Sequence, residues 1–228
     1  MEKTRILALE TSGMSGSVAA LAGDALLSEL PLHPDQRSAR SLAPGIRDLL
    51  LQVGWRASDV ELLAVTVGPG SFTGLRVGVT TAKTFAYAVG AKVIGLNTLE
   101  VIAAQVPGDL PGETLAVALD AQRGEVFAAM FRRGARDTME WLIEAAIVNR
   151  GDWLASLPVG CLVSGPVLSQ LAGDVPAGRV CVTRELWHPT AAAVGRLAAA
   201  RFAAGQLDDP WRLVPLYMRR SAAEEKAG

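Results

Sequence analysis

Histidines, aromatic side chains and basic charge are all scarce in this sequence of 228 residues, and their scarcity excludes several kinds of functional site. The two histidines, His33 and His188, form no HxxxH or HExxH pair, so no helix presents the two-histidine face of a common metal site. The GxSxG motif of many serine hydrolases is absent as well. The sequence therefore predicts no metal site, and it shows no metal pair or nucleophile–base pair of the kind that a peptidase needs.

The chain also lacks the features of a protein that binds nucleic acid on its own. Its formal net charge is −1, whereas phosphate binding usually requires a clear basic excess. Its aromatic residues are five Trp, two Tyr and five Phe, which are too few to predict base-stacking platforms. If RNA is involved, we expect another subunit to supply most of the phosphate contacts.

Cysteines and long apolar runs are equally scarce. Cys161 and Cys181 lie in apolar stretches without a CxxC pattern, which favours two buried, reduced thiols; a disulfide or a metal role is the alternative. The apolar run Ile6–Leu9 is too short for a signal sequence, and no later run reaches about 18 uncharged apolar residues. We therefore expect a soluble, cytoplasmic protein that does not contact a membrane.

What the sequence does contain is an ordinary globular composition, with 50% hydrophobic and 20% charged residues, arranged in short segments. In the first half, apolar runs and turn signals predict three strands followed by alternating helices and strands. We expect strands at 6–9, 17–22, 25–30, 62–67 and 92–96, and helices at 38–53, at 72–89 and after Asn97.

The second half repeats this order approximately. We expect strands at 114–121, 125–132, 138–144, 160–164 and 179–183, and helices at 151–157, 166–172 and 190–204. A duplicated βββαβαβα pattern is typical of the two-lobed α/β fold of the actin-like ATPases, which is ribonuclease H-like. We therefore predict a partner-binding N-terminal lobe over residues 1–106. We predict a C-terminal lobe over 107–228, whose last segment packs back on the first lobe.

The most informative segment joins a strand to a helix and contains Gly68, Gly70, Ser71, Thr73 and Gly74. Glycines at such a junction allow a tight reversal and a close approach of the backbone. The N-terminus of the helix that follows can attract an anion. The segment is not a P-loop, because no Gly-Lys-Ser/Thr follows at the required spacing. Two interpretations stay open: a turn that packs closely on a neighbouring element, or a phosphate site.

The helix expected at 72–89 carries little charge on any side. Its core face has apolar residues at helical spacing, namely Leu75, Val79, Ala82, Ala86 and Val89. Its opposite side is small and mostly uncharged, where a helix on the outside of a sheet normally carries charge. Either its own domain or another chain buries that side. We predict a partner interface formed by Leu42, Ile46, Arg76, Val77, Thr81, Phe85 and Ala88.

Two turns place carboxylates where a nucleotide can be bound. Glu10, Thr11 and Ser12 end the first strand, where a carboxylate can orient a metal-bound phosphate or water; a solvated or capping Glu is the common alternative. Asp120 and Arg123 lie in the matching turn of the second half, where a simple hairpin is the alternative. We treat both turns as candidate nucleotide-facing loops without a catalytic residue.

Taken together, these motifs resemble the TsaB (YeaZ) family over most of the chain, and most clearly over residues 6–130. The matching segments are Ile6–Ser12, Ser17–Ala19, Gly68–Gly78, Val93–Leu99, Asp120–Val126 and Pro215–Arg219. The string Gly-Pro-Gly-Ser-Phe-Thr-Gly-Leu-Arg is highly specific, whereas each of the other segments is weak alone.

This resemblance implies an actin-like ATPase fold and a role in making threonylcarbamoyladenosine on tRNA. It implies a non-catalytic subunit that pairs through first-lobe helices with TsaD, the metal-bearing paralogue, helps recruit the ATPase TsaE, and forms a homodimer in isolation. It also implies no cofactor, with ATP or ADP expected only in the assembled complex, and contact with tRNA only through that complex. The alternative is a weak stand-alone ATPase or a glycopeptidase-like hydrolase.

The chain departs from the family pattern at two places. The segment Asp35–Arg40 contains no His, although the family often carries one there. In the second-half turn, Gln122 stands where the family usually has Arg, and Arg123 follows it. We therefore carry over no family role to either place.

Overall fold

The computed structural model describes residues 3–14, 16–32, 38–110, 112–134 and 138–219. The chain divides into two compact units, Met1–Thr98 together with Thr190–Gly228, and Leu99–Pro189. Each unit contains its own five-stranded sheet with helices packed on it.

The first unit is built on a mixed sheet. Its strands are β1 (Arg5–Glu10), β2 (Ser17–Ala22), β3 (Ala25–Pro31), β4 (Leu62–Gly68) and β5 (Lys92–Asn97). Their order is β3-β2-β1-β4-β5, in which β1, β2 and β3 pair antiparallel and β1, β4 and β5 pair parallel. The central strands β1 and β4 are buried on both faces, which explains why they read as continuous apolar runs.

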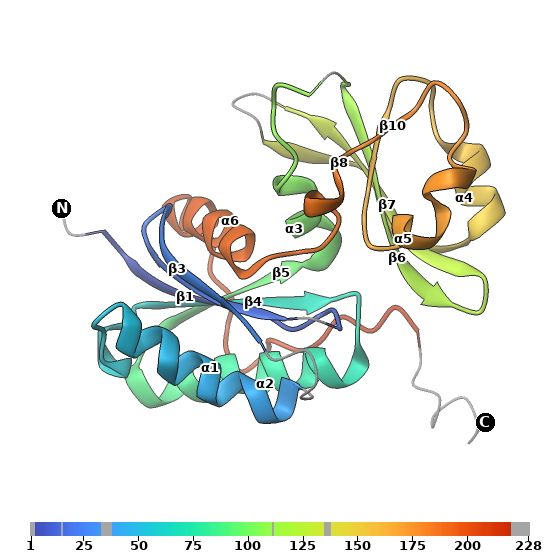
Figure 1. The fold of residues 1–228 in the computed structure, drawn as a ribbon. Helices are drawn as coiled ribbons and strands as arrows, with labels where there is room; N and C mark the ends of the chain where they lie inside the picture. The colour runs from blue at the N-terminus through green and yellow to red at the C-terminus, as the bar shows by residue number, and fades with distance from the viewer. Residues whose placement is uncertain (1–2, 15, 33–37, 111, 135–137, 220–228) are drawn as a thin grey trace. The chain divides into compact units, whose positions relative to one another are not determined.

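Helices cover both faces of this sheet (Figure 1). The helices α1 (Ser38–Gln52) and α2 (Phe72–Val89) lie on one face, and α6 (Ala191–Ala203) lies on the other. A short 3-10 turn, η1 (Ala57–Asp59), leads from α1 towards β4. The core beneath α1 and α2 joins both helices to the sheet through Leu7, Leu9, Leu42, Leu49, Leu63, Val65, Val79 and Ala82.

The second unit repeats the order of the first. Its strands are β6 (Thr114–Gln122), β7 (Glu125–Arg133), β8 (Met139–Asn149), β9 (Leu162–Ser164) and β10 (Val180–Cys181). Their order, β10-β9-β6-β7-β8, has the same mixture of antiparallel and parallel pairs as the first sheet. The structure therefore confirms the predicted duplication and the actin-like, ribonuclease H-like fold class.

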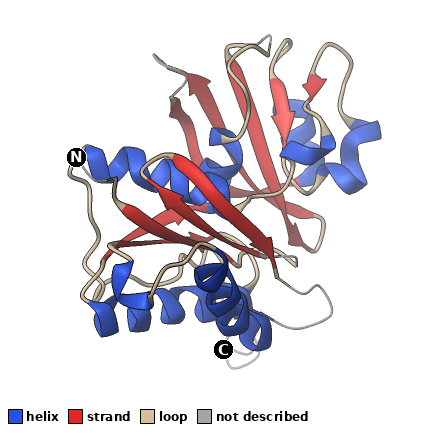
Figure 2. Cartoon of the chain, turned by 60° about the vertical axis from the view of Figure 1, so that its left-hand side comes forward, coloured by secondary structure: helices blue, strands red, loops and turns tan. Residues whose placement is uncertain are grey.

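The helices of the second unit are short. They are α3 (Thr98–Ala104), α4 (Arg150–Ser156) and α5 (Leu168–Leu171), with 3-10 turns η3 (Ala172–Asp174) and η4 (Arg184–Leu186). Residues of α4 and α5 share one core with the sheet, and residues of α3 share the core of its other face. Figure 2 shows these helices in blue against the red strands.

The division between the units differs from the boundary expected at residue 106. Leu99 and Ile102 of α3 pack with Phe131 of the second sheet, so α3 belongs to the second unit. The alanine-rich α6 returns to the first unit, where Gly195 lets it approach β2, because a Cβ there would overlap the side chain of Leu21. Both differences arise because packing partners, and not order along the chain, decide to which unit a helix belongs.

No helix among the described residues is both long enough and apolar enough to cross a membrane.

Candidate functional site

The glycine-rich loop between β4 and α2 rests on the turn that follows β1. The backbone N–H of Ser71 donates to the carbonyl oxygen of Ser12 at 2.7 Å. The hydroxyl of Ser71 then caps α2 by accepting from the N–H of Gly74 at 3.2 Å. The loop is therefore attached to its neighbour by main-chain contacts at the point where α2 begins.

Three glycines at intervals of four residues, Gly70, Gly74 and Gly78, let α2 come this close; we call them the glycine ladder. A Cβ at Gly70 would lie 2.5 Å from the carbonyl oxygen of Ser12, and Cβ atoms at Gly74 and Gly78 would overlap Thr11. No side chain can tolerate these contacts, so packing accounts for each glycine. Of the two interpretations of this loop, close packing therefore explains the sequence without a phosphate.

Glu10 is buried at the end of β1. Its side chain is 0% exposed, and its Oε1 accepts from the N–H and the hydroxyl of Ser12, both at 2.6 Å. Burial raises the pKa of Glu10 to about 6, and hydrogen bonds from Ser12 and Thr66 limit the rise. Thr11 and Ser12 are also buried, and the glycine ladder packs against these two residues.

The outward side of α2 carries a row of exposed residues at spacings of three and four. This outer stripe consists of Thr73, Arg76, Thr80, Thr84 and Tyr87, with exposed Ala88 beside it. The core face of the helix is buried as expected at Leu75, Val79, Ala82 and Ala86, and only half-buried at Val89. A solvent-facing stripe with one charge in five residues is unusual for a helix on the outside of a domain.

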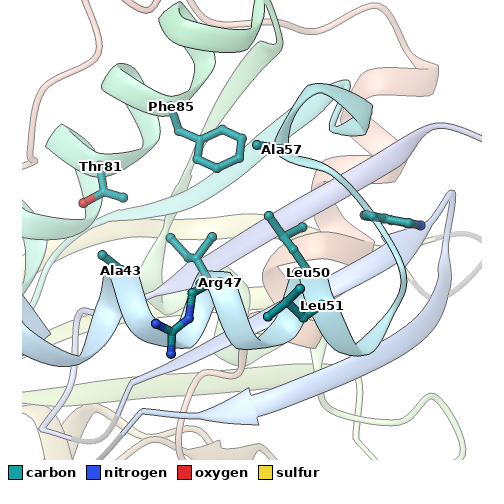
Figure 3. A pocket seen from close by; sticks show the side chains of 9 residues that line it. Ala43, Arg47, Leu50, Leu51, Ala57, Thr81 and Phe85 are labelled. Carbon is teal, nitrogen blue, oxygen red and sulfur yellow. The ribbon is translucent and has the colours of Figure 1, made fainter.

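An apolar groove with a volume of about 410 Å³ runs between α1 and α2. Figure 3 shows Phe85 and Thr81 of α2 facing Ala43, Arg47, Leu50 and Leu51 of α1 across it. Ile46, Trp55 and Ala57 complete the lining. The groove and the outer stripe are adjacent, because Thr81 lies three residues before Thr84 and residues three apart are neighbours on a helix surface.

The residues expected at a partner interface divide into three groups in the structure. Arg76 and Ala88 are exposed, whereas Val77, Thr81 and Phe85 are half-buried. Ile46 is 6% exposed but lines the groove. Leu42 is 1% exposed and belongs to the core, so it supports α1 from beneath. It is therefore not accessible to a partner, contrary to our prediction.

The C-terminal segment, residues 207–219, crosses the first unit beside α2. The N–H of Leu216 donates to the carbonyl oxygen of Val67 at 2.7 Å, which places the segment against the end of β4. The hydroxyl of Tyr217 accepts from Nε of Arg76 at 2.8 Å, and its ring lies 4.8 Å from that of Phe72. The guanidinium of Arg76 also lies 3.9 Å from the centre of the Phe72 ring. Arg76 is thus committed to contacts within its own unit.

The matching turn in the second unit is open. Oδ1 of Asp120 accepts from the N–H of Gln122 and from a guanidinium nitrogen of Arg150, both at 2.8 Å. Partial burial raises the pKa of Asp120, but these bonds, the charge of Arg150 and a bond from Gln170 outweigh it and lower the pKa overall. Gln122 and Arg123 have φ values of 63° and 55°, so the hairpin forces two non-glycine residues into the left-handed region.

The remaining candidates show no sign of a reactive site. Cys161 is buried, Cys181 is half-buried, and burial raises the pKa of both thiols. Burial and the charge of Arg184 lower the pKa of His188, whereas His33 and residues 35–37 lie outside the described residues. Among the described residues, no three His, Cys, Asp or Glu side chains are placed to hold a metal ion.

The sequence analysis missed several residues of this surface. Tyr87 and Trp211 are each 75% exposed and contact one another, with ring centres 5.7 Å apart. Leu51 and Trp55 line the groove. Spacing on α1 and α2 could have indicated Leu51 and Tyr87, but nothing in the local sequence shows that Trp211 reaches α2.

Comparisons with known proteins agree on one group of relatives. Residues 30–204 match the family model described as TsaD: tRNA N6-adenosine threonylcarbamoyltransferase. The chain is 28% identical to the tRNA threonylcarbamoyladenosine biosynthesis protein TsaB of Bacillus subtilis, over 97% of this chain and 96% of that protein. It is also 28% identical to the TsaB of Escherichia coli, over 97% of both chains. The solved structure of YeaZ from Pseudomonas aeruginosa superposes with a TM-score of 0.80 at 25% identity, covering 94% of this chain and 99% of that one.

Proposed function

Because this chain belongs to the TsaB (YeaZ) group of the TsaD family, and so to tRNA threonylcarbamoyladenosine biosynthesis, we propose that it is a non-catalytic subunit that pairs with TsaD. The face of α1 and α2 would form the contact. The observation that carries the proposal is the outer stripe with its neighbouring groove: a helical surface with a single charged residue, Arg76, next to an apolar channel. Surfaces of this kind on a folded chain usually bind another protein.

The geometry of the first turn supports a subunit without chemistry of its own. Glu10 is the carboxylate best placed by the fold to act on a phosphate, yet it is fully buried and bonded to Ser12. A catalytic acid or base must reach its substrate, and the side chain of Glu10 is 0% exposed. We propose that nucleotide is bound, if at all, only in the assembled complex.

The proposal extends to the rest of the machinery. Together with TsaD, the chain would help recruit the ATPase TsaE and would contact tRNA only through the complex, in the cytoplasm. With a net charge of −1, the chain offers little general attraction for RNA by itself. In the absence of TsaD, the same surface would hold two copies together as a homodimer.

Ala88→Glu tests the pairing directly. Ala88 is exposed on α2, so a glutamate there should leave the fold intact while placing a charge on the surface that a partner must desolvate. Ala155→Glu, at an exposed position on α4 of the second unit, is the matched control. We expect Ala88→Glu to weaken binding to purified TsaD at least about tenfold with an unchanged melting temperature, and Ala155→Glu to bind like the unaltered chain.

Two results would contradict this function. One is that the unaltered chain fails to bind TsaD, or that Ala88→Glu binds as tightly as the unaltered chain. The other is that the purified chain hydrolyses ATP with magnesium at an ordinary enzymatic rate of about 1 per second or more, which would favour a stand-alone ATPase. Val77→Glu is a less clear test, because Val77 is half-buried and packs against the core.

A further inference from the structure

An aromatic pair stands exposed where the C-terminal segment meets α2. Tyr87 and Trp211 are each 75% exposed, and their rings meet at an interplanar angle of 68°. Val214, from the same segment, is 64% exposed. Two large aromatic side chains left this open and in contact with one another are the kind of feature that dominates the free energy of protein–protein binding.

The pair is held on a fixed base. Asp208 accepts from the N–H of Gly95 at 2.7 Å, and the Lys83 ammonium donates to the carbonyl oxygen of Leu213 at 2.9 Å. Leu213 is 8% exposed and belongs to the core beneath α2. Because the segment is already ordered, this chain loses little conformational entropy when a partner covers Trp211. The contact is more favourable for that reason.

The pair also continues the outer stripe. Tyr87 lies three residues after Thr84 and seven after Thr80, so it occupies the same side of α2 at the end of the row. Trp211 then extends this surface onto a segment that begins after residue 204, where the match to the TsaD family model ends. The aromatic contribution therefore comes from a part of the chain outside the region that matches that model.

The charges around the pair suit a protein more than a nucleic acid. Arg76 is bonded to Tyr217, Lys83 to the backbone of Leu213, and Arg212 lies 3.8 Å from the carboxylate of Asp209. Cations engaged in this way are poorly available to phosphates, on which nucleic-acid binding depends.

We propose that the C-terminal segment is a second part of the partner surface, in which Trp211, backed by Tyr87, enters an apolar groove on TsaD. This inference rests on the proposed pairing with TsaD. The match to the TsaD family model spans both α1 and α2, so a TsaD chain has counterparts of the two helices that form a groove here. Because Trp211 lies outside the matched region, we assign this aromatic contact to the present chain and the groove that receives it to TsaD.

The test compares Trp211→Ala, Trp211→Phe and the control Val159→Ala, whose side chain is 78% exposed in the second unit. Binding to purified TsaD is measured by calorimetry, and the melting temperature of each variant is recorded. We expect Trp211→Ala to bind at least about tenfold more weakly, and Trp211→Phe and Val159→Ala to bind within about threefold of the unaltered chain. If Trp211→Ala proves unstable, Tyr87→Ala at the other half of the pair replaces it.

The outcomes separate this inference from the function on which it rests. If Trp211→Ala binds TsaD normally while Ala88→Glu does not, the pairing stands and the role of the segment is refuted. If Trp211→Ala instead reduces only the self-association of the chain, measured by sedimentation, the groove belongs to a second copy and the inference is overturned. If the unaltered chain does not bind TsaD, the function itself fails and this inference fails with it.

Discussion

The turns that follow β1 and β6 occupy corresponding places in two duplicated sheets, yet their carboxylates have opposite environments. Glu10 is fully buried, and its pKa is raised to about 6 by burial. The side chain of Asp120 is 36% exposed, and its pKa is lowered overall by Arg150 and the bonds around it, despite partial burial. The same position in the fold thus has a raised carboxyl pKa in one unit and a lowered carboxyl pKa in the other.

The two turns also differ in the element that follows the next strand and packs on them. In both units that strand leads into a Gly-Pro pair, Gly68-Pro69 and Gly165-Pro166, and a Cβ at either glycine would meet a backbone oxygen. In the first unit an 18-residue helix follows, carrying the glycine ladder over the turn. In the second unit α5 has only four residues, and the turn stays open. In the first unit, Thr11 and Ser12 of the turn are therefore packed against the glycine ladder of a long helix whose outer stripe has one charge in five residues.

The largest effect should come from the glycine ladder. Gly74→Ala would place a Cβ against the carbonyl oxygen of Thr11, a backbone atom that cannot move away easily. We therefore expect the free energy of unfolding to fall by about 3 kcal/mol. Gly173→Ala, where no atom lies within 4 Å, should be nearly neutral. Urea denaturation of both variants measures the difference. Equal stability of the two would mean that the ladder is not required for packing.

Removing the buried acid should have the next largest effect. Between pH 4.5 and 6 the unfolded chain loses the Glu10 proton before the folded chain does, so this group destabilises the fold by about 2 kcal/mol above pH 6. Glu10→Gln cannot ionise, and we expect it to be more stable than the unaltered chain by about that amount at pH 7 and similar to it below pH 4.5. The stability difference is measured by denaturation across this pH range. A variant that is less stable at pH 7 would show that the charged form of Glu10 is the one required by the fold.

The corresponding change in the second unit should have the opposite sign and a smaller size. Asp120→Asn removes the charge that Arg150 stabilises at an exposed site, so we expect a loss below about 1 kcal/mol at pH 7. The loss should disappear as the pH falls through the lowered pKa of Asp120, because the carboxylate of the unaltered chain is then protonated. The same denaturation series measures both variants. A gain in stability from Asp120→Asn would remove the contrast between the two turns.

The sequence correctly predicted the helices and strands that depend on local patterns. It did not predict features that depend on contacts between distant parts of the chain. Periodicity predicted the order of the strands and of the main helices, and the buried face of α2. The small size of the glycines predicted a close approach of the loop to its neighbour. The expected end of β8 at residue 144 was too early, because pairing with β7 carries the strand on to Asn149. The position of Trp211 beside Tyr87 depends on a return of the chain across more than a hundred residues, which no local pattern contains.

Hydrogen–deuterium exchange of the chain, alone and mixed with purified TsaD, tests most directly whether the first unit carries the partner surface. We predict slower exchange over residues 73–88 and 207–219 on mixing, with residues 120–126 unchanged. Protection confined to the turn around Asp120, or no protection along α2 at a TsaD concentration that saturates binding, would contradict the account.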